Sequence, residues 1–377
     1  MLTQDINTTK TMLPFRGLFT DISTCKNDSA CIIEKAGLDW KGIKMPLMIQ
    51  GARELHPYGQ YATVNSKTGN CIDGGRQISE NFQLPNNKEI ITDMCNFAQD
   101  NGLTMHHAGM IEGGRLVIGH AVHPDTINIT AEDKGYAQHL GDLSKSENQD
   151  LVEAGIVMVA SYESGKVSTW RPYANRFVCT NGVIITAKEL GQVNKYRLPH
   201  RGEKYDRSQV KGVFNSFANS FGAWGRNVKI LAETPATRPM QIGVLMETIQ
   251  GDLWDALIDE TYGRYGTPTA TPRQYYLDAL HSTDFVEKEL LTAVQDRGNR
   301  ALLAAIELND NQPGVEFVRG TLAQPYHAIT HWVDHYRGKV NKQDAAVEAS
   351  LFGLGAQMKQ GALEVAMNMQ AWAQTVQ

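Results

Sequence analysis

Apolar and polar residues alternate along two stretches of the chain in the manner of paired β-strands. The first predicted hairpin joins residues 103–108 to residues 115–122, across a turn that contains Gly113. The second joins residues 156–162 to residues 167–171 across Ser164-Gly165. Alternation with a period of two on both sides of a glycine turn is typical of antiparallel pairing. Because no helix separates these strands, we expect a mostly antiparallel sheet rather than a doubly wound one.

Before the hairpins, the pattern predicts two helices and two further strands. A short helix follows Ser29, which we expect to be its N-cap, and a longer helix covers residues 87–99. Short apolar runs predict strands at residues 46–50 and 60–64. This part of the chain is therefore expected to add both helices and strands to the sheet.

After Pro199, apolar residues recur at spacings of three and four, which predicts helices over 207–231, 240–262 and 284–308. Residues 342–375 carry apolar side chains near heptad spacing, typical of a packing helix or of an oligomerisation arm. The C-terminal part of the chain is therefore expected to be mostly helical.

These patterns together predict an α+β protein, with an antiparallel, hairpin-rich sheet packed with helices and followed by a mostly helical C-terminal region. We expect four parts: a flexible N-terminal segment (1–28), a hairpin-rich α+β domain (29–206), a helical region that completes the domain (207–340), and a helical C-terminal tail (341–377) as a possible oligomerisation arm.

The composition supports a globular chain. Of its 377 residues, 42% are hydrophobic, which argues against a disordered chain. Neither a long apolar run nor a signal-peptide pattern is present, so we expect a cytoplasmic protein without a membrane partner. The cysteines are odd in number and contain no C-x-x-C pair, so we expect reduced, buried thiols at Cys25, Cys31, Cys71, Cys95 and Cys179.

The charge is unevenly distributed. The chain has a net charge of −5, but residues 171–211 carry nine basic and three acidic side chains, a local charge of +6 that leaves −11 for the remainder. Aromatic residues interleave with these basic residues, which is typical of a surface that binds single-stranded nucleic acid. The predicted contacts are Arg171, Arg176, Lys195, Arg197, Arg201, Lys204, Arg207 and Lys211 to phosphates, Trp170, Tyr173 and Tyr196 by stacking, and Asn181 by hydrogen bonding. An ordinary solvated loop with core aromatics remains the alternative interpretation.

A second hypothesis is a metal-dependent enzyme. His327, His331 and His335 would share one face of a helix, where imidazoles can ligate zinc or iron. A face with Asp252, Asp255 and Asp259 would suit magnesium. In both cases a structural helix is the simpler interpretation, so no metal, catalytic residue or cofactor is assigned.

The hairpin histidines, His106, His107, His120 and His123, belong to a strand pattern in which neighbours point to opposite faces, so they do not predict a catalytic pair. Phosphate-loop, nucleophile-elbow and zincin motifs are also absent from the sequence. Catalysis therefore has little support at this level.

Several phrases resemble the phage/plasmid-like protein family that carries domain of unknown function 932. They include GGRLVIGHA at 113–121, RFVCTN at 176–181 and WVDHYR at 332–337, and the resemblance covers roughly residues 29–340. Family members more often have Asn at the position of His327 and an acidic residue at that of His331, which weakens the three-histidine hypothesis. The resemblance implies a phage or mobile-element context but no settled activity.

The leading expectation is a non-catalytic, homo-oligomeric protein that binds single-stranded DNA in recombination or replication, including strand annealing. It would act in the host cytoplasm if phage-encoded. The arrangement is also similar to that of phage single-strand annealing proteins, as an architectural analogy. A metal-dependent enzyme acting on nucleic acid or nucleotides and a structural or host-interaction protein remain alternatives.

Overall fold

The computed structural model confirms the α+β class. It describes residues 19–48, 60–72, 77–128, 136–137, 151–163, 168–176, 181–184, 196–198, 221–252, 254–256, 291–292, 299–337, 349–351 and 353–376. Its contacts divide the chain into two compact units. The first contains residues 1–126, 153–174 and 185–221, and the second contains residues 127–152, 175–184 and 222–377.

The strands of both predicted hairpins are present as neighbours in one sheet, while the predicted turn of the second hairpin, at Ser164-Gly165, lies outside the described residues. The order is β1 (Thr20–Asp21), β5 (Thr104–Ile111), β6 (Leu116–Asn128), β8 (Leu151–Ser161) and β9 (Ser168–Arg176), while β11 (Tyr196–Leu198) also pairs with β9. β5 and β6 are antiparallel and are joined by a short 3-10 turn, η2 (Glu112–Gly114). The antiparallel prediction is therefore confirmed for this pair.

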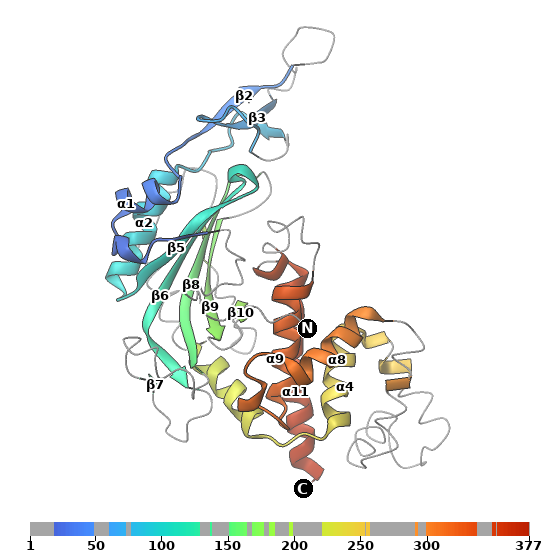
Figure 1. Ribbon diagram of the computed structural model, residues 1–377. Coiled ribbons are helices and arrows are strands. Elements are labelled where there is room, and N and C mark those ends of the chain that lie inside the picture. Colours follow the sequence, from blue (N-terminus) through green and yellow to red (C-terminus); the bar gives the residue numbers. More distant parts are fainter. Residues whose placement is uncertain are drawn as a thin grey trace. The chain divides into compact units, whose positions relative to one another are not determined.

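Two helices, α1 (Ser29–Lys35) and α2 (Asn87–Asp100), cover one face of the sheet (Figure 1). In α2 the apolar side chains, including Met94 and Phe97, are buried. Gly119 of β6 makes room for this packing, because a Cβ at that position would lie 2.7 Å from the sulfur of Met94. The predicted helix over 87–99 is thus confirmed and packs on the sheet.

Two local predictions in this region need correction. The N-cap of α1 is Asp28, not Ser29, because the Asp28 carboxylate accepts a hydrogen bond from the Ala30 amide at 2.9 Å. The strand expected at 46–50 lies earlier, as β2 (Gly42–Pro46). It forms a small antiparallel sheet with β3 (Gln60–Asn65), to which β4 (Gln77–Ser79) adds.

The end of the expected flexible segment 1–28 is structured. β1 pairs with β5, and a 3-10 turn, η1 (Ser23–Cys25), follows it. Cys25 is joined to Cys31 by a disulfide, so the expectation of reduced thiols is wrong for these two residues. The turn between these two cysteines brings their Cα atoms to 5.6 Å from one another. Of the others, Cys95 is free and buried as expected, Cys71 is free but exposed, so the expected burial is wrong there, and Cys179 lies outside the described residues.

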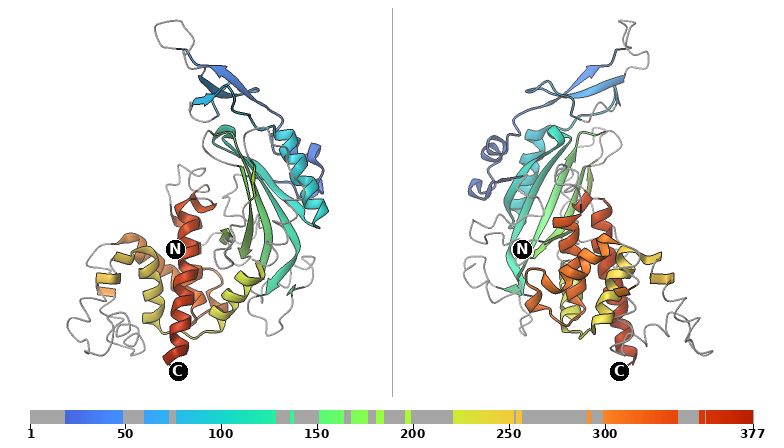
Figure 2. Two further views of the ribbon diagram at one scale, coloured as in Figure 1. Left: turned by 180° about the vertical axis from the view of Figure 1, so that it is seen from behind. Right: turned by 45° about the vertical axis from the view of Figure 1, so that its right-hand side comes forward.

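The second unit is mostly helical (Figure 2). Its named elements are α4 (Arg238–Ile249), α8 (Arg300–Asn311), the 3-10 turn η5 (Val315–Phe317), α9 (Ala323–His331), the π-helix η6 (Trp332–Tyr336), α11 (Leu354–Val376) and the strands β7 (Tyr136–Ala137) and β10 (Asn181–Ile184). Residues 221–233 are also helical. The predicted helices 240–262 and 284–308 are therefore present in part, with shifted ends.

The heptad-like tail packs inside the second unit. α11 contacts α4 and α9, and its apolar residues Ala362, Met369 and Trp372 are buried. The apolar stripe of the sequence therefore contributes to the core of this unit. Within the part of the chain that the structure describes, no helix is long and apolar enough to cross a membrane.

Candidate functional site

Strands β9 and β11 bring the two ends of the basic segment, residues 171–211, into one sheet. In the antiparallel register, Arg197 lies opposite Thr169 and Tyr196 lies opposite Trp170. Arg171 is two positions along β9 from Thr169, so the backbones of Arg171 and Arg197 are diagonal neighbours, roughly 7–8 Å apart. Two basic positions that are distant in the sequence are therefore adjacent in the fold.

Two of the predicted stacking residues are core residues. Trp170 is 1% exposed and packs against Phe97 with ring centroids 5.0 Å apart. Tyr173 is 0% exposed and lies edge-on to His120 at 5.0 Å. The prediction that Trp170 and Tyr173 stack on bases is therefore wrong for this structure, because both sides of β9 are covered at these positions.

The remaining predicted contacts are described only in part. Arg171 is half-buried on β9. The structure gives strand positions, and no side-chain account, for Arg176, Asn181, Tyr196 and Arg197. Lys195, Arg201, Lys204, Arg207 and Lys211 lie outside the described residues. Their roles remain predictions.

A row of aromatic rings, the histidine row of His107, His120 and Tyr173, crosses the sheet from β5 to β9. His107 stacks on His120 with centroids 5.8 Å apart, and His120 meets Tyr173. β8 lies between β6 and β9, and it carries Gly155 at this point. A Cβ on Gly155 would lie 2.8 Å from Nε2 of His120, so the missing side chain makes room for the row.

A β-bulge changes the directions expected for the two adjacent histidines. The β5–β6 register shifts between Met105 and His107, which leaves His106 as the extra residue. The rings of His106 and His107 are consequently only 6.2 Å apart, and Nδ1 of His106 lies 3.9 Å from Oε1 of the buried Glu153. Regular alternation would have separated these two side chains.

His106, His107 and His120 are mostly neutral at pH 7, because the pKa of each is lowered from its ordinary value. Burial lowers the pKa of His107 to about 4, with a smaller contribution from His106, and it also lowers the pKa of His106 and of His120. Neutral imidazoles donate and accept hydrogen bonds but do not attract phosphates. The histidine row therefore adds no positive charge to the basic segment.

The three histidines of the metal hypothesis lie where α9 passes into a π-helix. α9 ends at His331, and the next turn is the π-helix η6, closed by a hydrogen bond from the Arg337 amide to the Trp332 carbonyl at 2.9 Å. The rings of His331 and His335 are 4.4 Å apart across this junction, and the ring of His327 lies 5.0 Å from that of Tyr326. Within the described ranges, no group of three His, Cys, Asp or Glu side chains is placed to hold a metal ion.

The magnesium face is described only in part. Asp252 and Asp255 lie within the described residues, and Asp259 lies outside them. Among the described residues, neither Asp252 nor Asp255 belongs to a group of three possible metal ligands. The aspartate hypothesis therefore gains no support from the structure.

The π-helix carries a buried ion pair. Asp334 accepts hydrogen bonds from Ser350 and from Lys359 of α11, and Lys359 also donates to Oγ of Ser350 at 2.9 Å. Both charged side chains are at most 1% exposed. Burial lowers the pKa of Lys359, while the charge of Asp334 and its hydrogen bond oppose that shift. This pair links the WVDHYR phrase to the C-terminal helix.

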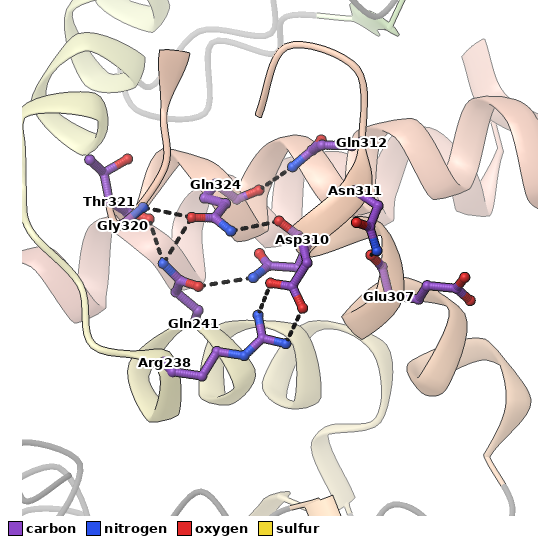
Figure 3. A network of polar contacts seen from close by, with 10 residues as sticks. Arg238, Gln241, Glu307, Asp310, Asn311, Gln312, Gly320, Thr321 and Gln324 are labelled. Atoms are coloured by element: carbon purple, nitrogen blue, oxygen red, sulfur yellow. Dashed lines mark hydrogen bonds and ion pairs between the residues drawn. The ribbon is translucent and has the colours of Figure 1, made fainter. Parts of the chain in front are cut away.

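An amide network connects α4, α8 and α9 (Figure 3). Gln241 donates to Gln324 at 3.1 Å and accepts from Asn309 at 2.9 Å. Gln324 donates to the carbonyl of Asn309 at 2.6 Å, and Gln312 donates to the carbonyl of Gln324 at 2.9 Å. All four side chains are buried. The network therefore fixes the relative positions of three helices.

An ion pair lies beside this network. Arg238 makes two hydrogen bonds to Asp310, at 2.5 and 2.6 Å.

Sequence reasoning missed the amide network because buried and exposed Gln or Asn look the same in a sequence. The one available signal for the histidine row was a glycine inside a strand pattern, at Gly155.

Comparison with known proteins identifies one family. No match was found among curated proteins or among solved structures. The family described as domain of unknown function (DUF932) matches residues 76–372. The match begins at residue 76 and extends past residue 340, so both expected ends of the resemblance were wrong, and the C-terminal helix lies largely within the family domain. Because the match covers most of the chain, this protein belongs to the family of domain of unknown function 932 (DUF932).

Proposed function

We propose that this chain is a non-catalytic protein that binds single-stranded DNA through the basic segment. The proposal places it in a phage or mobile element, where it would act as a homo-oligomer in recombination or replication, including strand annealing. The phage context rests on the resemblance of its sequence phrases, and the oligomer rests on the analogy with annealing proteins.

One observation carries the proposal. The register of β9 with β11 supports a continuous basic surface, because Arg171 and Arg197 occupy diagonal positions on paired strands. The basic segment, with its local charge of +6, therefore has basic positions on both of these paired strands. A basic loop with separated ends would offer no such fixed spacing for successive phosphates.

The charge balance of the chain fits this role. Lys and Arg side chains release counterions from the phosphates that they contact, which gives affinity without sequence preference. The remainder of the chain carries −11 and would repel a polyanion. Binding is thereby restricted to the basic segment.

Fewer aromatic residues remain as candidates for stacking on bases than the sequence predicted. Trp170 and Tyr173 are excluded as stacking residues by their burial, which leaves Tyr196 on β11. Neutral histidines on the sheet supply no charge. We therefore assign most of the affinity to phosphate contacts and a smaller share to one ring.

A fluorescence anisotropy assay tests the proposal with labelled single-stranded DNA, duplex DNA and RNA at about 50 mM salt. The test variant replaces Arg197, Arg201 and Lys204 by Ala. We expect it to bind single-stranded DNA at least about tenfold more weakly than the wild type, since three phosphate contacts are lost.

The matched control removes three exposed basic residues outside the basic segment: Lys41, Lys88 and Arg319. This variant has the same net charge as the test variant, and we expect wild-type affinity. Equal losses in both variants would show that only total charge matters. No binding to any oligonucleotide would contradict the proposal and favour a protein partner for the basic segment.

A further inference from the structure

The disulfide between Cys25 and Cys31 closes a turn with an unusual backbone. Lys26 and Asn27, which lie inside the turn, have φ angles of 47° and 65°. Two consecutive residues other than glycine in the left-handed region are unfavourable and require support from their surroundings. The disulfide provides a covalent constraint on this turn.

The constrained turn presents Asn27 to the first residues of β5. Nδ2 of Asn27 donates to the Leu103 carbonyl at 2.9 Å, and Oδ1 accepts from the Met105 amide at 2.7 Å. One side chain therefore bonds to the backbone carbonyl before residue 104 and to the backbone amide after it. This Asn27 clamp lies immediately before the bulge that begins at Met105.

β1 adds a second attachment at the same place. The Ile22 amide donates to the His106 carbonyl at 2.8 Å, and Asp21 pairs with His107. β1 has only two residues, so it is a short edge strand with little stability of its own. Its position therefore depends on the turn that follows it.

We propose that the Cys25–Cys31 disulfide is a reducible staple that holds the Asn27 clamp on β5. Reduction frees the left-handed turn, weakens both Asn27 hydrogen bonds and loosens β5 at the bulge that carries His106 and His107. The fold thus contains a thiol-sensitive device at one edge of its sheet. It does not depend on the proposed DNA binding.

The chemistry is a thiol–disulfide exchange with a small thiol or a dithiol protein as reductant. The attacking thiolate bonds to Sγ of Cys31, which is half-buried, and the Sγ–Sγ bond breaks to leave Cys25 as a thiolate that takes up a proton. A second thiolate then attacks the external sulfur and releases Cys31. Two thiols are oxidised to one disulfide while the protein disulfide is reduced.

Peptide mapping tests whether the staple forms. Trypsin cleaves after Lys26, between the two cysteines, and it yields peptides 17–26 and 27–35. In protein alkylated without reductant, we expect these two peptides to be joined, and in reduced protein we expect them to separate. If the peptides are unjoined in protein exposed to air or oxidised glutathione, the proposal is wrong.

Hydrogen exchange tests the coupling to β5. We expect reduction by dithiothreitol to accelerate exchange of the Met105 amide about tenfold or more, because a local opening that was blocked becomes accessible. The variant Cys25→Ser/Cys31→Ser is expected to behave like reduced wild type without any reductant. Unchanged exchange in α2 serves as the control for an intact fold.

The variant Asn27→Gly isolates the clamp. Glycine keeps the left-handed backbone at this position and removes both side-chain hydrogen bonds. Oxidised Asn27→Gly should exchange Met105 as fast as reduced wild type, and reduction should change it less than about twofold. If reduction leaves wild-type exchange unchanged, or accelerates the Asn27→Gly variant as much as the wild type, the coupling is refuted.

Discussion

One polar cluster in each unit illustrates a different chemistry: the first unit has the histidine row, and the second unit has the amide network. The sheet of the first unit buries imidazoles and a carboxylate, and its His106–Glu153 pair is separated by 3.9 Å. The amide network of the second unit is held by hydrogen bonds of 2.6 to 3.1 Å. Imidazoles change charge near neutral pH and amides do not. The stability that the histidine row contributes should therefore depend on pH, whereas the stability that the amide network contributes should not. The second unit as a whole still contains titratable groups, because it also buries His327 and His331.

The buried ion pair of the second unit gives the largest expected effect. Replacing Lys359 by Met leaves Asp334 charged and buried without its cation, so we expect a loss of about 3–5 kcal/mol in the free energy of unfolding. Urea denaturation measures this loss. The double variant Lys359→Met/Asp334→Asn is the control and should recover part of the stability. An equal loss in both variants would show that packing, rather than the charge, is responsible.

The amide network gives the next largest effect. Gln324→Ala removes the partners of Gln241, of the Gly320 amide and of the Asn309 carbonyl, so we expect a loss of about 2–3 kcal/mol in unfolding free energy. Urea denaturation should give the same loss in mildly acidic and in mildly alkaline buffer, because no member of the network titrates there.

Asn311 supplies the matched control for Gln324. It is exposed and donates only to the Glu307 carbonyl among the contacts drawn in Figure 3, so Asn311→Ala should cost less than about 0.5 kcal/mol. A loss in Gln324→Ala that depends on pH would remove the distinction between the amide network and the histidine row.

Acidification should destabilise the sheet. The pKa of His107 is about 4 in the folded chain, against 6.5 for an unperturbed histidine, so between these values the unfolded chain binds a proton that the folded chain does not. His107 does not lower the free energy of unfolding above about pH 7. Its protonation in the unfolded chain lowers that free energy by on the order of 2 kcal/mol at about pH 5. Denaturation at several pH values measures it.

The variant His107→Gln is the control for this titration. It removes one titrating group, so the loss of stability between about pH 7 and about pH 5 should become smaller, whatever the stability at neutral pH. His106 and His120 still titrate in the variant, and the dependence should not vanish. An identical pH profile in both proteins would show that His107 is not protonated on unfolding in this range.

The smallest expected effect concerns the buried ring of Trp170. Trp170→Phe keeps an aromatic ring against Phe97 and removes no DNA contact, so the affinity for single-stranded DNA should change less than about twofold. Tyr196→Ala, by contrast, should weaken binding by about 1–3 kcal/mol if its ring stacks on a base. A large loss in Trp170→Phe would restore Trp170 to the interface.

Much of the fold was predictable from periodicity. Both hairpins follow from alternation around glycine turns, and α2 follows from its apolar spacing. The stacking role of Trp170 was mispredicted because alternation does not reveal that both faces of a strand are covered. The His106–His107 proximity depends on a one-residue bulge, and the helix after His331 continues as a π-helix turn. Neither feature has a period in the sequence.

The disulfide was missed for a different reason. Its two cysteines are six residues apart and meet only because Lys26 and Asn27 adopt left-handed backbone conformations. Cysteine counting takes no account of such a turn. The concentration of basic residues, by contrast, was visible in the sequence, and the structure adds the pairing of the two strands in which Arg171 and Arg197 lie.

The salt dependence of single-stranded DNA binding tests the central claim most directly. The logarithm of the association constant is measured against the logarithm of salt concentration for the wild type and for the variant with Ala at Arg197, Arg201 and Lys204. Each phosphate contact contributes about 0.7 to the slope, so we predict a slope shallower by about 2 in the variant. Identical slopes in the two proteins would contradict phosphate binding by this segment.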